Sequence, residues 1–307
     1  MTIAATSRTR VAFIAESTFG VTPSTPTFKT LRRTSGEMTT RKGTVVSDEI
    51  QLDRNVRSEQ QVAQDPQGGY AFELSYGTMD DLLAAALGGV WSTNTLVNGS
   101  TETSFTIEET ADLGASTAYN RFVGCEVDTL SLNFAARKEV TGNIAFKGQT
   151  ETTATTLISG ATYTAPNSNI IDTGVSLASL SVASLSPAPT IKNIQLNFAN
   201  NLRLREKLGS LYTDSFGTGK MDITGSFDAY FESQALYQAI LAHGGGSMAF
   251  TIGAVTNKKY TFTMPNIQFL SGARRLGGKN DDVMVQVPFR ALYDGSSKSI
   301  QIDRAVA

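Results

Sequence analysis

The chain has a single cysteine, Cys125, and a single histidine, His243, among its 307 residues. One cysteine cannot form an intramolecular disulfide, and without a second thiol it cannot build a zinc site with several thiolate ligands. One histidine excludes a cluster of histidine ligands and any HExxH motif. The sequence therefore indicates no metal-binding residues, and a lone thiol fits a reducing compartment.

The sequence also lacks an excess of positive charge and any long apolar run. Its 26 Lys and Arg residues against 28 Asp and Glu leave a formal charge of -2, too few cations to neutralise a phosphate backbone. No stretch approaches the roughly 20 apolar residues of a membrane-spanning helix, and the first residues contain no apolar signal-peptide core. We therefore expect a protein made in the cytoplasm, with no membrane partner and no sequence-specific contact with nucleic acid.

Residues that could carry catalysis are equally few. His243 would have to serve any Ser-His-Asp triad, but it follows an expected helix, where a positive charge favours the helix C-terminus. Cys125 has no base beside it in the sequence, so we expect a buried side chain. The glycine runs lack the Lys-Ser/Thr of a phosphate-binding loop, and adjacent carboxylates such as Asp80 and Asp81 point apart. We predict no catalytic residue, no cofactor and no enzyme activity.

Much of the sequence alternates apolar and polar side chains with a period of two, which is the pattern of strands with one buried face. Two segments, 78–87 and 232–242, instead carry Leu and Ala at three- and four-residue spacing and end at glycine runs, which favour helix termination. The sequence thus predicts a mainly β fold with few short helices.

The surroundings of the two expected helices match, which indicates an internal repeat. Similar strands precede the helices at 69–74 and 225–231, and Phe-Thr-Ile follows each of them, at 105–107 and 250–252. We interpret the chain as two copies of one β-rich unit, each flanked by one helix. The expected parts are an N-terminal arm over 1–26, a first unit over 27–150, a connector over 151–189 and a second unit over 190–307.

A long polar segment interrupts a strand pair in each unit, over 41–68 and over 200–220. Irregular segments of this length are uncommon in compact domains and are usually functional. We expect arms that order against a neighbouring subunit, although a surface loop without a partner would have the same composition. The charged residues expected to make such contacts are Asp48, Glu49, Asp53, Arg54, Arg57 and Glu59.

The polar side of the expected strands is unusual in composition. It is mostly Asn, Gln, Ser and Thr with scattered carboxylates, whereas ordinary solvent faces are dense in Lys, Arg and Glu. Such a surface suits the wall of a DNA conduit, because it repels phosphates weakly and offers no cation to hold them. The solvent face of a β-sandwich without a channel would show the same pattern. The candidate channel-facing residues are Thr129, Ser131, Asn133, Glu139, Thr141, Asn143, Asn193, Gln195, Asn197, Asp222, Thr224, Ser226 and Asp228.

Three runs resemble the opening of the major tail tube proteins of long-tailed, non-contractile bacteriophages (siphophages). They are ESTFGVTP at 16–23, LRRTSG at 31–36 and SDEI at 47–50, and the likeness continues over 69–91 and through the strand–helix–strand units that follow. The resemblance implies a structural virion protein with a duplicated β-sandwich or barrel unit, whose inner sheets join into one β-barrel around the DNA channel.

The resemblance also implies partners. Members of this family form rings of sixfold or pseudo-sixfold symmetry, stacked around a tape measure protein between tail terminator and tail-tip proteins. The segment 41–68 and the N-terminal arm would then lie between subunits, and DNA would pass through without specific contacts. Because the repeat supplies two units per chain, we expect a ring of three copies, with a ring of six as the alternative. The protein would reside in the virion tail after assembly in the host cytoplasm.

Two other classes of virion protein share this composition. One is a head–tail connector or decoration protein, and the other is a carbohydrate-binding protein of a tail fibre. The internal repeat and the paired long segments favour a tube. The low aromatic content, 8%, disfavours a carbohydrate-binding cleft.

Overall fold

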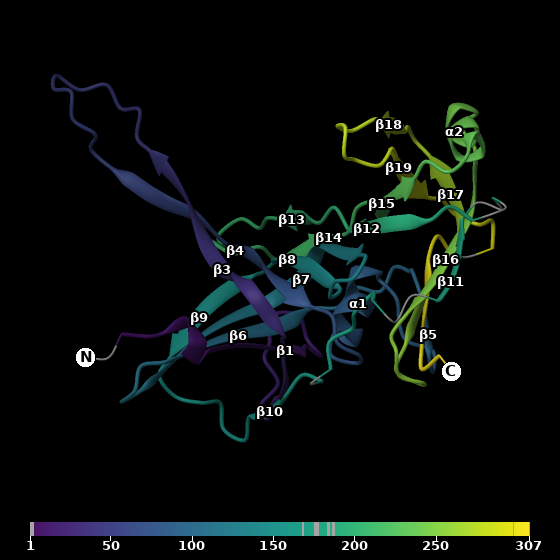
Figure 1. The fold of residues 1–307 in the computed structure, drawn as a ribbon. Helices are drawn as coiled ribbons and strands as arrows, with labels where there is room; N and C mark the ends of the chain where they lie inside the picture. Colours follow the sequence, from purple (N-terminus) through teal and green to yellow (C-terminus); the bar gives the residue numbers. More distant parts are fainter. Residues whose placement is uncertain are drawn as a thin grey trace.

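The computed structural model describes residues 3–167, 169–174, 178–182, 185, 188–296 and 298–306. It is mainly β, as the alternation predicts, with two short helices, α1 (Asp80–Ala86) and α2 (Gln234–Leu241), and a 3-10 turn, η1 (Thr6–Arg8) (Figure 1). Both helices lie within the predicted segments 78–87 and 232–242. No helix in the described part of the chain is long and apolar enough to cross a membrane.

One antiparallel sheet, here named the large sheet, extends through both halves of the chain. Its neighbouring strands are, in order, β3 (Arg33–Val46), β4 (Glu59–Glu73), β8 (Thr141–Lys147), β7 (Thr117–Ala135), β12 (Ile191–Ala199), β15 (Asp222–Tyr230), β19 (Met284–Ala291) and β18 (Ala273–Arg275). The strands β7 and β12 join the two halves, with Leu132 opposite Leu196. The two predicted units therefore share a single sheet.

The remaining strands form two smaller groups and a hairpin. The first group is β10 (Thr162–Thr164), β2 (Thr27–Thr30), β1 (Thr9–Ala15), β6 (Phe105–Asp112), the beginning of β7 and β9 (Thr150–Ala154). The second group is β11 (Ala178–Val182), β16 (Gly245–Ile252), β17 (Tyr260–Phe269), β20 (Gln301–Arg304) and β5 (Thr95–Val97). The hairpin is β13 (Arg203–Arg205) with β14 (Ser215–Gly217).

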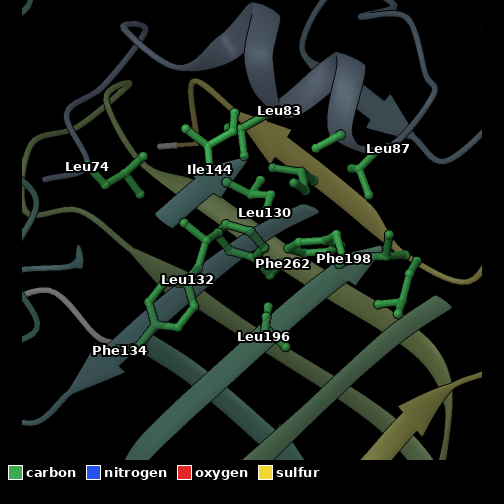
Figure 2. Close-up of a cluster of buried hydrophobic side chains, with 14 of the residues drawn as sticks. Leu74, Leu83, Leu87, Leu130, Leu132, Phe134, Ile144, Leu196, Phe198 and Phe262 are labelled. Atoms are coloured by element: carbon green, nitrogen blue, oxygen red, sulfur yellow. The ribbon is translucent and has the colours of Figure 1, made fainter. Parts of the chain in front are cut away.

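The apolar side of the large sheet forms one core that continues across both halves. Leu130, Leu132 and Leu196 are almost fully buried, and Leu83 of α1 and Leu87, the residue after it, belong to the same buried cluster (Figure 2). From the second half, the rings of Phe250 and Phe262 lie 5.1 and 5.5 Å from the ring of Phe134, both near edge-on. Edge-on aromatic pairs of this kind add stability beyond the area they bury.

The predicted irregular loop over 41–68 is wrong for most of its length. The strands β3 and β4 stay paired from Arg33 opposite Phe72 to Val46 opposite Glu59, and only residues 47–58 connect them. Figure 1 shows this hairpin projecting far from the body. We name residues 40–66 the hairpin arm and residues 47–58 the arm tip. The pairing escaped the sequence analysis because neither side of the arm is buried, so its residues show no apolar–polar alternation.

The predicted N-terminal arm over 1–26 also needs correction. From Thr9 to Ala15 the chain forms β1, a strand between β2 and β6, in which Val11, Ala12 and Phe13 are buried. Only the residues before Thr9 precede the first strand, and residues 1 and 2 lie outside the described residues.

The segment 151–189 does more than connect two units. It contributes β10, which pairs with β2, and β11, which pairs with β16. Its Ile171 is buried and exchanges backbone hydrogen bonds with Leu74 and Val140. Residues 168, 175–177, 183–184 and 186–187 of this predicted connector lie outside the described residues.

Candidate functional site

The polar side of the large sheet brings together the candidate channel-facing residues of both halves. Strand pairing aligns them in rows across the sheet, because directly opposed residues of neighbouring strands point to the same side. One row is Asn143, Ser131, Asn197 and Thr224; the next is Thr141, Asn133, Gln195 and Ser226; a third is Asn193 with Asp228. We name this surface the polar face.

Thr129 and Asp222 extend the polar face at the opposite ends of a further row, since both lie opposite Ala199. Glu139 is the exception among the thirteen candidates. It precedes β8, where it makes an isolated bridge to Asp172 instead of joining the sheet rows. Glu139 is exposed next to the buried Val140, so the period-two alternation continues ahead of β8, but Glu139 lies outside the paired rows.

The polar face carries few charges. Among its cations, Lys147 of β8 pairs with Asp128 at 3.1 Å, and Arg275 of β18 donates to the Gln286 side chain. Arg290 of β19 lies opposite Thr224, and its Nη2 donates to Asp222 Oδ2 at 3.1 Å. Pairing with a carboxylate leaves the guanidinium less able to hold a passing phosphate. Asp228 lies opposite Gln286 on the same strand pair. The rows thus present mainly amides and hydroxyls, and their charged residues are Asp222, Asp228 and Arg290.

The arm tip and Glu59, the first residue of β4, carry the predicted charged contacts, and the tip also holds apolar residues that the sequence analysis missed. Asp48, Glu49, Asp53, Arg54, Arg57 and Glu59 are all exposed, and Arg57 pairs with Asp53. Between them, Ile50 is 96% exposed, Val56 is 72% exposed and Leu52 is fully exposed. Three apolar side chains at the end of a projecting hairpin are a typical sign of a protein contact. Their spacing within a polar segment was visible in the sequence.

The second long segment, 200–220, folds back onto its own chain. Gln64 of the hairpin arm donates its backbone N–H to the Leu211 carbonyl at 2.8 Å, and Gln149 Nε2 donates to the Thr213 carbonyl at 3.2 Å. Lys147 Nζ donates to the Leu202 carbonyl at 2.8 Å. This segment therefore supports the base of the hairpin arm and is not a second free arm.

Glu16, in the run ESTFGVTP, explains why that run adopts its shape. Its carboxylate accepts hydrogen bonds from the backbone amides of Gly20 and Gly124, at 2.8 and 2.9 Å, and from the hydroxyls of Ser104 and Thr106, at 2.7 and 2.8 Å. Four donors aimed at one carboxylate fix the connection after β1 against β6 and β7.

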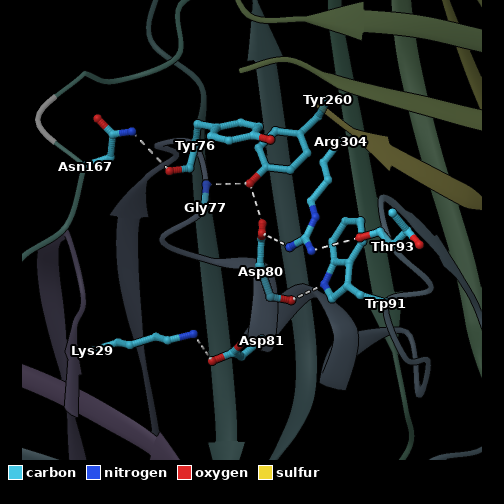
Figure 3. Close-up of polar contacts among 10 residues, drawn as sticks. All are labelled: Lys29, Tyr76, Gly77, Asp80, Asp81, Trp91, Thr93, Asn167, Tyr260 and Arg304. Carbon is cyan, nitrogen blue, oxygen red and sulfur yellow. Dashed lines mark hydrogen bonds and ion pairs between the residues drawn. The ribbon is translucent and has the colours of Figure 1, made fainter. Parts of the chain in front are cut away.

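The adjacent carboxylates Asp80 and Asp81 open α1 and hold separate partners (Figure 3). Asp80 accepts a hydrogen bond from the Tyr260 hydroxyl at 2.5 Å and pairs with Arg304 at 2.5 Å. Asp81 pairs with Lys29 at 2.5 Å. Burial, with the Asp80 carboxylate beside it, raises the pKa of Tyr260 well above its ordinary value. These carboxylates tie the first helix to both ends of the chain.

His243 and Cys125, the two residues considered for catalysis, lie at a helix end and in the core. His243 follows α2 with a positive φ of 51°, and its backbone N–H donates to the Ile240 carbonyl at 3.0 Å. Cys125 is fully buried, which raises the pKa of its thiol and disfavours the reactive thiolate. Within the described residues, no three His, Cys, Asp or Glu side chains gather closely enough to hold a metal ion.

Comparison with known protein families identifies a relationship. The family model described as "Phage tail tube protein" matches residues 6–291, nearly the whole chain. No curated protein matches the sequence.

Proposed function

The chain belongs to the phage tail tube protein family, and from this premise we propose that it is the major tail tube subunit of a long, non-contractile tail, whose rings stack into the conduit for DNA. The polar face carries this proposal. It crosses both halves of the chain in continuous rows that are poor in unpaired cations. The family is one of structural virion proteins and not of enzymes.

The polar face is proposed as the channel wall. Amide and hydroxyl groups hold a layer of water, and the scattered carboxylates repel phosphates weakly, so DNA would meet no binding site along the tube. A cation-rich wall would instead gain affinity for DNA by releasing counterions and would hinder its passage. The paired state of Arg290 supports this assignment.

Ring size follows from the number of strands that each copy supplies. The large sheet has eight strands. Three copies would give a barrel of about 24 strands, and strands about 4.8 Å apart with a tilt of about 40° would place its backbone on a circle about 48 Å across. That leaves room for a DNA duplex after the lining side chains are added. Six copies would double the diameter, so we favour three copies with pseudo-sixfold symmetry.

The hairpin arm is proposed as the contact between stacked rings. It extends well beyond the body, and its tip offers Ile50, Leu52 and Val56 between charges of both signs. Burying such side chains against another copy contributes about 1.5–3 kcal/mol each. The charges would then set the orientation of the contact rather than its strength.

The proposed partners beyond other copies of the chain are the tape measure protein inside the tube and the terminator and tip proteins at its ends. Assembly would take place in the host cytoplasm, and the protein would end in the virion tail. These partners are carried over from the resemblance of the sequence to the major tail tube proteins.

Negative-stain electron microscopy of the concentrated protein tests this function. We expect stacked rings or hollow tubes, with three repeats in end views. Closed particles without a channel would contradict the proposal and would favour a connector or decoration protein.

A further inference from the structure

The junction between β7 and β12 suggests how neighbouring copies join, an inference that rests on the proposed ring. The order of neighbouring strands in the first half is β3, β4, β8 and β7, and in the second half it is β12, β15, β19 and β18. A helix follows β4 in one half and β15 in the other. The last strand of the first half, β7, thus pairs with the first strand of the second half, β12.

This order leaves one strand at each end of the large sheet with a single strand partner. Within the described residues, β3 pairs only with β4, and β18 pairs only with β19. By position, β3 corresponds to β12 and β18 corresponds to the end of β7. The β18 edge of one copy therefore has the same relation to the β3 edge of another copy that β7 has to β12.

Both edges are accessible over the residues that would pair, while further along β3 the backbone N–H of Met38 donates to the Glu109 carboxylate of β6 at 2.9 Å. Residues 273–275 of β18 are exposed, and so are Thr34, Ser35, Gly36 and Glu37 of β3. An open cavity of about 290 Å³ borders the β3 edge and is lined by Arg33, Gly36 and Glu37 together with residues of β1 and β6. Unpaired edges of this kind are sites of strand addition unless something covers them.

When Phe72 of β4 is aligned with Phe227 of β15, the strand registers of the first half can be compared with those of the second half. The next residues back, Ala71 and Ser226, lie opposite Ser35 and Gln195, so Ser35 corresponds to Gln195. Across the other edge of the same strands, Ala71 lies opposite Asn143 and Ser226 lies opposite Pro288.

Asn143 of β8 therefore corresponds to Pro288 of β19, and two residues earlier Thr141 corresponds to Gln286. Thr141 lies opposite Asn133, and Gln286 lies opposite Ala273, so Ala273 corresponds to Asn133. Within the chain, Asn133 lies opposite Gln195 at the β7–β12 junction. The equivalent contact between copies is Ala273 opposite Ser35.

We propose that rings close by antiparallel pairing of β18 of one copy with β3 of the next, with Ala273 opposite Ser35. The partner is a second copy of this chain, and each contact repeats the junction within the chain. The polar rows then continue from copy to copy without a change of side, because Ser35 lies opposite Ala71 and joins the row of Asn143 and Ser131.

A cysteine pair tests the proposed edge contact. In the double variant Ser35→Cys, Ala273→Cys, the two thiols of adjacent copies would lie opposite each other, within disulfide reach. We expect oxidation of assembled protein to convert most of the single-chain band into linked chains on non-reducing denaturing gels. Dithiothreitol should restore the single-chain band. The native Cys125 is present in every variant and is fully buried.

The matched control is the double variant Thr39→Cys, Ala273→Cys. Thr39 is exposed like Ser35 but lies four residues further along β3, about 13 Å away, which is too far for a disulfide. Each single variant serves as a second control. Linkage in the first double variant alone supports the proposal.

The outcomes separate this inference from the proposed function. Tubes that form without the Ser35–Ala273 link, or that link through Thr39, would overturn the edge assignment and leave the tube intact. If neither the variants nor the unmodified chain form rings or tubes, the proposed function fails, and the edge assignment fails with it.

Discussion

At the scale of single residues, Glu16 shows how one buried contact organises a connection between strands. Its carboxylate serves four donors, two of which are backbone amides. Gly20 and Gly124, the residues that supply those amides, both have positive φ values, 73° and 62°. The carboxylate therefore stabilises a backbone shape that these glycines make accessible.

Replacement of Glu16 by Ala should lower the free energy of unfolding by about 2–3 kcal/mol, because charge-assisted hydrogen bonds are lost and the amides of Gly20 and Gly124 are left unpaired. Urea denaturation measures the change, with an unchanged m-value showing that the transition itself is the same. The exposed neighbour Ser17 gives a matched control in Ser17→Ala. Equal stability of the two variants would contradict the assigned role of Glu16.

Glu126 gives the molecule a dependence on pH. Burial, and after it the nearby Glu102 carboxylate, raise the pKa of this carboxyl to about 7, against a smaller lowering by Arg205. Because the folded state holds the proton more tightly than the unfolded state, the stability from this group is full below about pH 4.5 and is lost as the pH rises through about 7.

The variant Glu126→Gln should therefore lose this decline between about pH 4.5 and 7, and at pH 8 it should be more stable than the unmodified protein, by on the order of 2 kcal/mol after allowance for solvent screening. Chemical denaturation at a series of pH values measures the difference. A parallel pH profile for the two proteins would exclude Glu126 as its source. Asp128→Asn, which removes a nearby carboxylate paired with Lys147 at 3.1 Å, is the control.

At the scale of elements, the sequence predicts the helices and the buried side of each central strand, but not which strands are neighbours. The apolar–polar alternation predicts that Leu130, Leu132 and Ile194 are buried, since each of these strands has one solvent-facing side. The pairing of β7 with β12 joins residues about 60 positions apart, and nothing local to either strand specifies it. The hairpin arm was missed for the opposite reason, because both of its sides are exposed.

The arm tip allows a direct comparison between apolar and charged contacts. The triple variant Ile50→Ser, Leu52→Ser, Val56→Ser should raise the concentration needed for polymerisation at least about tenfold, because three apolar side chains would no longer be buried between rings. Sedimentation of assembled protein over a concentration series measures this threshold. The monomer should keep its stability, since these side chains make no contact with the core.

The matched variant Asp53→Asn, Arg57→Gln removes the exposed ion pair of the arm tip and should shift the threshold much less, because exposed ion pairs contribute about 0–1 kcal/mol. A larger effect from this charge variant than from the apolar triple would show that the tip binds through its charges, as the sequence analysis first predicted.

At the scale of the whole molecule, contacts of several kinds hold the two halves together. The β7–β12 pairing joins their sheets, the rings of Phe134, Phe250 and Phe262 join their cores, and Asp80 joins α1 to Tyr260 and Arg304. The halves should therefore behave as one folding unit, although the sequence reads as two.

Differential scanning calorimetry should accordingly show a single unfolding transition for the monomer. The variant Phe134→Ala should lower the stability of that whole transition by about 3–5 kcal/mol, because it empties space at the contact between the halves. Two separate transitions, with one of them unchanged in the variant, would show that the halves fold independently.

The central claim is that the polar face borders the channel of the assembled tube. A helical reconstruction of the tube by cryo-electron microscopy tests this most directly, because it shows which side of the large sheet borders the channel. We predict three copies per ring, with the rows of Asn133, Gln195 and Ser226 lining the channel and the hairpin arms reaching between rings. A channel lined by any other surface, with these side chains turned toward the outside of the tube, would contradict the account.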